Sequence, residues 1–220
     1  MTSFVIVTLV LCLAHFSTLV HSIPGPIDLA QALADRARYP QVKGYFRIEA
    51  NIITMVNPRG TTKNWMPCDL VPGKCDPKIT AAIDYETPNN DFGKDSVPFG
   101  NYQLLWEGTG KTSVDINKIL SKDVCNHDTR KVNVRIRAMD RDTLSDDVID
   151  HWSCFILTTT PPAADERSSE WSDEKVCSGH NGSHKITWKY RWFFIPAEDC
   201  KETAGSSGII RRNIPFFGKK

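Results

Sequence analysis

This 220-residue chain has no excess of charge of one sign, no long apolar run beyond its N-terminal segment and no familiar catalytic motif. Its 27 basic and 26 acidic side chains nearly cancel, whereas proteins that hold nucleic acids by bulk electrostatics are usually strongly basic. Beyond the N-terminal segment, no uncharged apolar stretch reaches the roughly 18 residues of a membrane-spanning helix. The G-x-S-x-G, H-E-x-x-H and P-loop motifs are absent as well. We therefore expect no enzyme, no nucleic-acid partner, no small-molecule substrate and no multi-pass membrane protein.

The N-terminus has the composition of a secretory signal peptide. Residues 4–16 (FVIVTLVLCLAHF) are apolar over the length of an h-region, and Val20 and Ser22 suit a signal-peptidase site. The segment is short for a spanning helix and no basic stop-transfer cluster follows it, although an uncleaved membrane anchor is the alternative. The sequence predicts a cleaved signal at 1–22 and a secreted, extracellular protein.

Cleavage would remove Cys12 and leave six of the seven cysteines. In an oxidising compartment these six predict up to three disulfides; they are Cys68, Cys75, Cys125, Cys154, Cys177 and Cys200. Cys68 and Cys75 flank a Pro-Gly turn and are expected to close one loop, while the other pairings stay open. The sequon that starts at Asn181 lies in a polar stretch, where we expect a surface loop that is a candidate for a glycan.

Hydrophobic and polar residues alternate in four segments of the remaining chain. This period-two pattern is typical of strands with one buried face. It covers residues 45–53, 79–85, 131–140 and 186–192, and further strands are expected at Tyr102–Trp106 and Cys154–Leu157. Turn-rich segments such as 87–100 separate the strands. Several short strands with almost no helical periodicity predict an all-β protein, as an antiparallel β-sandwich rather than a barrel.

The expected layout has four parts. They are a signal peptide at 1–22, a linker or short helix at 23–43, one β-sandwich domain at 44–200 and a disordered tail at 201–220. Residues 27–38 are rich in Ala and Leu and favour a short helix that ends before Pro40, with an unstructured linker as the alternative. The tail combines a Gly-Ser-Ser-Gly stretch with a basic end.

The most informative segment is Met139–Asp150, with the sequence MDRDTLSDDVID. It follows a predicted strand directly, so a D-x-D pair and a second acidic pair lie on one loop. Carboxylates on a turn can converge on a hard cation such as Ca²⁺. The spacing does not fit an EF-hand, because Leu144, Ser145 and His151 occupy positions that need Asp or Asn, Gly and Glu. The alternative is a solvated acidic loop whose Asp residues cap turns.

This strand and its loop, residues 132–150, resemble the third apical loop of a C2 domain, and Cys75–Ile79 (CDPKI) resembles the end of the first. More narrowly, the order of four features is similar to the N-terminal C2-like domain of Notch ligands of the Delta/Jagged type. These features are Gly44–Glu49, Asn57–Gly60, the loop from Cys68 to Asp76, and the aromatic strand Trp188–Phe194 before Cys200. The resemblance covers residues 44–200 and implies a C2-like β-sandwich that binds an extracellular partner.

Carried over residue by residue, the resemblance implies a set of calcium ligands. The stronger candidates are Asp76, Asp140, Asp142 and Asp147, and the weaker ones are Asn57 and Asp146. Asn57 stands where the family has Asp, and Asp150 stands where it usually has Gly, so we expect one site of weak affinity. The Cys-rich receptor-binding module and EGF repeats of full Notch ligands do not follow Cys200. A conventional activating ligand is therefore not expected.

Basic residues on the predicted strands suggest a second surface. Arg47, Arg135, Arg137, Lys189 and Arg191 all occupy outward positions. On adjacent strands they would form a basic face for acidic lipid heads or sulfated glycans, although charge on strand exteriors also serves solubility and edge protection. Cys177, His180 and His184 have a zinc-like spacing but lack an evident fourth ligand.

The sequence thus predicts a secreted, non-enzymatic C2-like binding module with weak Ca²⁺ dependence. Its partner would be an extracellular receptor of the Notch type, or a membrane or glycan surface. An alternative comes from the tail, where Arg211-Arg212 and the final Gly-Lys-Lys resemble a precursor that releases a short amidated peptide. The simpler reading of that tail is a solvated extension.

Overall fold

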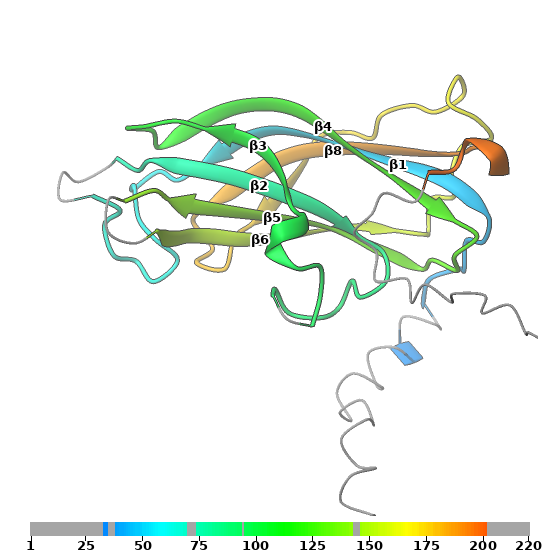
Figure 1. Cartoon of the computed structure of the whole chain (residues 1–220), viewed down its shortest axis with the longest axis horizontal. Coiled ribbons are helices and arrows are strands. Elements are labelled where there is room, and N and C mark those ends of the chain that lie inside the picture. Colours follow the sequence, from blue (N-terminus) through cyan, green and yellow to red (C-terminus); the bar gives the residue numbers. More distant parts are fainter. Residues whose placement is uncertain (1–32, 35–37, 70–73, 94, 143–145, 202–220) are drawn as a thin grey trace, which may run out of the picture. The chain divides into compact units, whose positions relative to one another are not determined.

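The described part of the chain contains eight strands, all paired antiparallel (Figure 1). The structure is a computed structural model, and it describes residues 33–34, 38–69, 74–93, 95–142 and 146–201. The strands are β1 (Tyr45–Val56), β2 (Pro77–Asp84), β3 (Gln103–Glu107), β4 (Ser113–Cys125), β5 (Lys131–Asp140), β6 (Asp147–Leu157), β7 (Lys175–Ser178) and β8 (Lys185–Phe194). Two 3-10 turns, η2 (Phe99–Asn101) and η3 (Ala197–Asp199), complete the elements.

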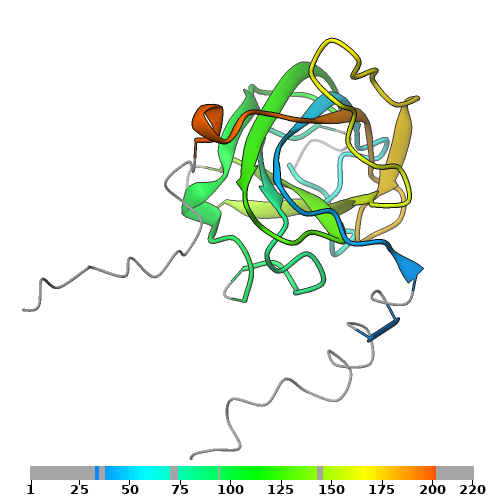
Figure 2. The ribbon, with the colours of Figure 1, turned by 90° about the vertical axis from the view of Figure 1, so that its right-hand side faces the viewer.

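The strands form two four-stranded sheets. One has the order β4-β1-β8-β7 and the other the order β3-β2-β5-β6. Figure 2 views the resulting sandwich from the end that carries η3, drawn in orange. The prediction of an all-β antiparallel sandwich is therefore confirmed.

Alternation along the strands places the core between the sheets. On β1, Phe46, Ile48, Ala50 and Ile52 are fully buried, whereas the residues between them are partly exposed. Buried apolar side chains of β2, β5, β6 and β8 pack against them. The largest fully buried side chains are Trp152 and Trp188. Removal of this apolar surface from water is the main force that holds the two sheets together.

Three disulfides connect the six cysteines of the domain. Cys68–Cys75 closes the predicted loop, which confirms that pairing. Cys154–Cys177 joins β6 of one sheet to β7 of the other. Cys125–Cys200 joins the end of β4 to the segment after η3.

The antiparallel order brings three loops to one end of the sandwich, at the left in Figure 1. We call the loops at 57–76, 108–112 and 141–146 the first, second and third apical loops. Between β2 and β3 the chain makes a longer excursion at 85–102, whose Phe92 and Phe99 lie against Arg135 and Arg137 of β5.

Several predictions fall outside the described residues. The signal peptide at 1–22 and the tail after Lys201 belong to this part of the chain. Of the predicted helix at 27–38, only Leu33, Ala34 and Arg38 are described, and all three have helical backbone. Among the described residues, no helix has both the length and the apolar character needed to cross a membrane.

Candidate functional site

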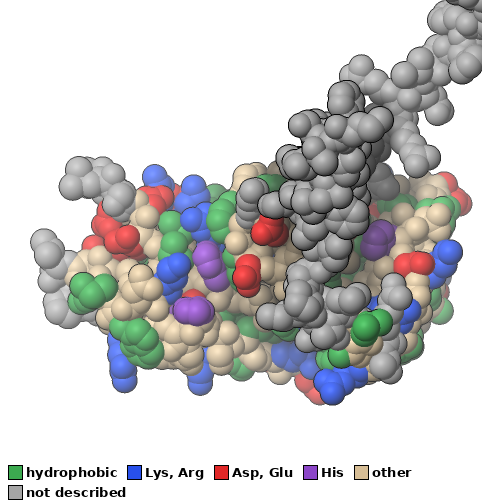
Figure 3. Space-filling view, turned by 90° about the horizontal axis from the view of Figure 1, so that it is seen from below, with side chains coloured by type: hydrophobic (Ala, Val, Ile, Leu, Met, Phe, Trp, Pro, Cys, Tyr) green, Lys and Arg blue, Asp and Glu red, His purple; other side chains and the backbone are tan. Residues whose placement is uncertain are grey.

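Three aspartates meet at the apical end of the sandwich. Asp140 ends β5, Asp142 follows it in the third apical loop, and Asp69 lies next to Cys68 in the first. One carboxylate oxygen from each lies within 4.8 Å of the others. Figure 3 shows acidic side chains, in red, gathered at this end of the molecule. We call these three residues the acidic cluster.

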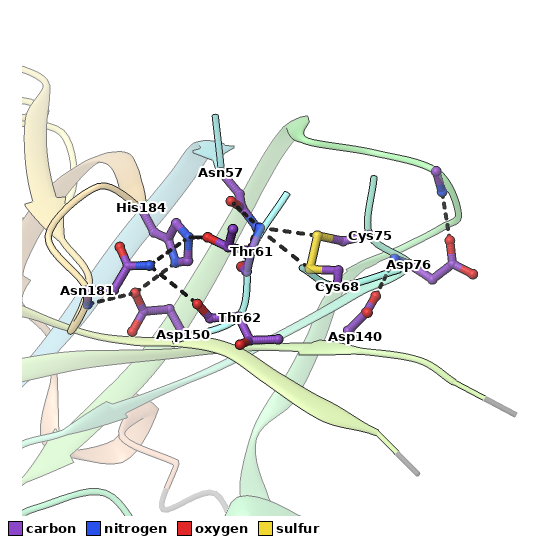
Figure 4. The surroundings of a disulfide bond; sticks show 11 residues. Asn57, Thr61, Thr62, Cys68, Cys75, Asp76, Asp140, Asp150, Asn181 and His184 are labelled. Carbon is purple, nitrogen blue, oxygen red and sulfur yellow. Dashed lines mark hydrogen bonds and ion pairs between the residues drawn. A yellow bond between two sulfur atoms is a disulfide. The ribbon is translucent and has the colours of Figure 1, made fainter. Parts of the chain in front are cut away.

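Asp140 is the buried member of the acidic cluster, with no exposed surface. Its Oδ1 accepts a hydrogen bond from the backbone N–H of Asp76 (Figure 4). Its Oδ2 is buried and has no hydrogen-bond partner among the described residues. Burial raises the pKa of Asp140 to about 6, and the negative charges of Asp142, Asp69 and Asp76 add to that rise against the opposing backbone hydrogen bond.

Asp76 borders the acidic cluster and connects it to the second apical loop. Its Oδ1 accepts a hydrogen bond from the Gly110 N–H at 2.7 Å, and its backbone carbonyl accepts one from Arg141. Together with Asp142, Glu107 and Arg141, it lines a pocket between the second and third loops. Arg141 forms an ion pair with Glu107 across this pocket.

The predicted ligands thus separate into groups. Asp140 and Asp142 come together, and Asp76 contacts Asp140 through its backbone. Asp146 and Asp147 are exposed and lie outside the cluster, although their charges help to raise the pKa of Asp142 after the larger effect of desolvation. Asp69 was not predicted. The available signal was its position inside the Cys68–Cys75 loop, which also carries Asp76 into the site.

Asn57, the weaker candidate from the first loop, is fully buried and forms hydrogen bonds within that loop. Its Oδ1 accepts from the Thr61 N–H at 3.1 Å, and its Nδ2 donates to the Thr61 carbonyl at 2.8 Å. The same Nδ2 lies 3.3 Å from Cys75 Sγ (Figure 4). Because both ends of the carboxamide are used in this way, Asn57 is not part of the proposed ligand set.

The tip of the first apical loop presents apolar surface to solvent. Trp65 is 51% exposed and Met66 is 64% exposed. Trp65 adopts a left-handed backbone with φ of 66°, and its N–H is held by the Thr62 carbonyl at 3.0 Å. The Arg59 guanidinium lies 5.6 Å from the Trp65 ring centroid. A non-glycine residue in this conformation is uncommon and is maintained only where its surroundings fix it.

The predicted basic face is not one surface. Arg47, Lys189 and Arg191 lie on the β1–β8 sheet, but Arg135 and Arg137 lie on the other one. The prediction that Arg135 faces outward to a ligand is wrong, because it is fully buried and bonded to Asp84 at 2.7 Å. The excursion at 85–102 covers this part of the sheet, and its carbonyls at Thr87 and Asn90 accept from Arg135 as well.

Acidic partners neutralise two of the three predicted basic residues on the β1–β8 sheet. Arg47 bonds to Asp123 at 2.6 Å, and Arg191 bonds to Glu49 at 2.7 Å. Lys189 and Arg191 lie over the ring of Trp171. These contacts fit the alternative reading, in which the strand exteriors carry charge for solubility.

The sequon lies in a surface loop as predicted, since His180 and Gly182 are exposed, but the Asn181 side chain itself is buried. Asn181 is only 8% exposed, and its Nδ2, the atom to which a glycan would be attached, donates to His184 Nε2 at 3.1 Å and to the Thr62 carbonyl at 3.4 Å. The zinc-like set nearby is used differently too, since Cys177 pairs with Cys154 and His184 is fully buried.

Comparisons with known proteins agree with this architecture. Two antiparallel sheets with acidic side chains in the apical loops are the architecture of a C2-like binding module. The crystal structure of a C2 domain protein from Ramazzottius varieornatus is 43% identical to the chain, covers 76% of this chain and 99% of its own, and superposes with a TM-score of 0.72. The chain therefore belongs to the C2 domain family.

Two further solved structures match less closely. Human GIVD cytosolic phospholipase A2 is 11% identical and covers 71% of this chain and 18% of its own, with a TM-score of 0.45. Drosophila C2-DSL-EGF1 is 9% identical and covers 67% of each chain, with a TM-score of 0.41. No protein-family model and no curated protein matches the chain.

Proposed function

We propose that the protein is an extracellular, non-enzymatic C2 module that binds Ca²⁺ weakly and then docks its first apical loop on an anionic membrane surface. The observation that carries this proposal is the buried, unpartnered Oδ2 of Asp140 beside the carboxylates of Asp69 and Asp142. Membership of the C2 domain family supports a binding role over a catalytic one.

The donor set favours a hard cation. Ca²⁺ takes about six to eight oxygen ligands at roughly 2.3–2.6 Å, and three carboxylates supply at most six oxygens. Asp142 is exposed and Asp69 is partly exposed, so a bound ion keeps water ligands. An affinity of about 10⁻⁴–10⁻³ M, as in other extracellular calcium modules, is the expectation. The ion would neutralise carboxylates that otherwise repel one another.

Charge neutralisation gives calcium control over membrane contact. Without the ion, the acidic cluster repels anionic lipid heads, which holds Trp65 and Met66 away from the surface. With the ion bound, the same end becomes less negative, and an exposed Trp beside an exposed Met suits the interfacial region of a bilayer. Arg59, which lies against the Trp65 ring, adds a cation that attracts phosphate groups.

An extracellular location is supported by the three disulfides, which persist in oxidising compartments. A Notch-type receptor as the partner stays a prediction that rests on the order of sequence features. A sulfated glycan is less favoured, because acidic side chains neutralise Arg47 and Arg191, two of the three predicted basic residues on the β1–β8 sheet. Release of an amidated peptide concerns residues outside the described part of the chain and also stays a prediction.

Calcium titration calorimetry tests the metal site. Asp140→Asn keeps the shape of the side chain and removes its charge, so we expect calcium affinity to fall at least about tenfold. Asp128→Asn is the matched control, because Asp128 is an exposed aspartate between β4 and β5, at the other end of the sandwich. Equal calcium heats in the wild type and Asp140→Asn would contradict the proposed site.

Vesicle sedimentation tests the membrane contact. We expect calcium-dependent binding to vesicles of phosphatidylcholine mixed with phosphatidylserine, weaker binding at higher salt, and none to phosphatidylcholine alone. Trp65→Ala should lower the bound fraction several-fold without changing calcium affinity. Leu104→Ala is the control, since Leu104 of β3 is also 51% exposed but lies outside the first apical loop. Binding that is the same with calcium or with a chelator would overturn the membrane proposal.

A further inference from the structure

A buried polar network lies behind the first apical loop and takes no direct part in the acidic cluster. His184, which is fully buried, bridges Asp150 of β6 and Thr61 of the loop. Its Nδ1 lies 3.0 Å from Asp150 Oδ2, and its Nε2 lies 3.1 Å from Thr61 Oγ1 and 3.1 Å from Asn181 Nδ2 (Figure 4).

The neighbours of His184 determine its protonation. The Ser183 N–H can only donate, and it donates to Asn181 Oδ1 at 2.9 Å, so the other end of that carboxamide is the NH₂ group. This NH₂ donates to His184 Nε2, which must therefore be an acceptor. The proton is then on Nδ1 and is donated to Asp150. His184 is thus the neutral imidazole with one defined tautomer.

Asp150 is held as a rigid anion. Its carboxylate accepts from the backbone N–H groups of His151 at 2.7 Å, His180 at 2.8 Å and Asn181 at 3.4 Å, in addition to His184. Burial acts to raise the pKa of Asp150, but these hydrogen bonds outweigh it and lower the pKa. Gly179 allows the close approach, because a Cβ there would lie 2.1 Å from Asp150 Oδ2.

The network reaches the acidic cluster through the first apical loop. Thr61 is bonded to Asn57, whose Nδ2 also contacts Cys75 of the loop disulfide. Cys68, the other half of that disulfide, directly precedes Asp69. One end of the loop is therefore held by His184 and the other by a covalent bond.

We propose that Asp150 and His184 are positioning residues for the calcium site, because they hold the first apical loop in the shape that places Asp69 beside Asp140. This inference rests on the proposed calcium function. If the Thr61 contact is lost, the loop populates other shapes in the absence of metal. The binding-competent fraction falls, and the apparent calcium dissociation constant rises in proportion.

Thr61→Val replaces only the hydroxyl, with a methyl group of similar size, and is the informative variant. We expect it to weaken calcium binding about three- to tenfold. It should also speed amide hydrogen exchange in residues 57–69 of the metal-free protein. Thr158→Val is the matched control, because Thr158 is 1% exposed and donates to the Arg130 carbonyl at 2.7 Å, at the end of the sandwich opposite the apical loops. It should change neither quantity, even if both variants lose similar global stability.

His184→Gln and His184→Leu sharpen the test. An amide offers one donor and one acceptor at nearly the spacing of the two imidazole nitrogens, so Gln should restore most of the calcium affinity that Leu loses. Unchanged exchange in residues 57–69 of Thr61→Val, with wild-type calcium affinity, would overturn the inference. A wild type that gives no calcium heat would instead end the proposed function, and faster loop exchange in Thr61→Val would then show a loop anchor without a metal role.

Discussion

Asp140 and Asp150 are two fully buried aspartates on adjacent strands of one sheet, and their surroundings differ in almost every respect. Asp150 accepts hydrogen bonds from three backbone N–H groups and from His184, and its pKa is lowered. Asp140 accepts one, has an oxygen with no partner among the described residues, faces other carboxylates, and has a pKa raised to about 6. Two equally buried aspartates therefore have pKa values that are shifted in opposite directions.

The difference teaches how to separate a structural carboxylate from a binding one. Burial disfavours the charge of either group, and the number of hydrogen-bond donors and the charges of the neighbours decide whether that cost is offset. The fold supplies Asp150 with all the hydrogen bonds that its charge needs, so it can serve as an anchor. Asp140 has one donor and, in the described part of the chain, an unpartnered Oδ2, so its charge is unfavourable in the metal-free protein, and the proposed Ca²⁺ ion would stabilise it.

The largest expected effect is on stability. Asp150→Asn replaces an anion that four donors surround, and we expect the free energy of unfolding to fall by about 3 kcal/mol. Asp140→Asn removes an unfavourable buried charge, and we expect the metal-free protein to gain about 1 kcal/mol at pH 7. Urea denaturation in the presence of a chelator measures both. Similar losses in the two variants would mean that Asp140 is as structural as Asp150.

A smaller effect should appear as pH is varied. The folded pKa of Asp140, about 6, lies above its ordinary value of 3.8. The folded state therefore binds more protons between these values, and this contribution to stability is present at low pH and is lost as pH rises through about 6. The metal-free wild type should gain about 1 kcal/mol from this group between pH 7 and pH 5.

Asp150 contributes with the opposite sign, because its lowered pKa gives stability that is lost only on further acidification. Urea denaturation of the wild type and Asp140→Asn at both pH values isolates the Asp140 contribution, as the variant should lack it. Calcium affinity should fall over the same interval, since protonated Asp140 is a poor ligand. An identical pH dependence in the two proteins would refute the raised pKa.

The smallest expected effect concerns the charges around Asp140. Asp142→Asn removes the neighbouring charge that raises the Asp140 pKa most, so this pKa should fall by about half a unit, and by less at high salt. Carboxyl-carbon NMR titration measures it directly. Asp147→Asn should leave the Asp140 pKa unchanged, because Asp147 is not among the charges that raise it. A shift of equal size in both variants would show long-range repulsion in place of a local cluster.

The regular part of the fold was predictable because alternation reports burial directly. Residues 45–53 and 131–140 were predicted as strands and form β1 and β5. β4 was not predicted, because its pattern breaks where Asn117 adopts a φ of 48° and the register with β1 shifts. The buried positions Val114, Ile116, Leu120 and Val124 keep their alternation, but Lys118 at the bulge is charged and exposed, so the apolar series that would mark the strand is interrupted.

The acidic cluster could be predicted only in part. Asp140 and Asp142 lie on one turn, and their proximity follows from sequence spacing. Asp69 reaches them through the Cys68–Cys75 bond and the antiparallel order of β1, β2 and β5, which are tertiary features. Arg135 was misplaced for a related reason, since alternation gives the outward face of a strand but not the excursion that covers it.

The Cys125–Cys200 bond has a practical consequence for how the molecule can be presented. Asp123 reinforces it by accepting from the Lys201 N–H at 2.9 Å and from Arg47, so Lys201 is fixed at the end of the sandwich opposite the apical loops. A protein captured on a sensor chip or bead by an attachment at Lys201 would present its apical loops to the solution.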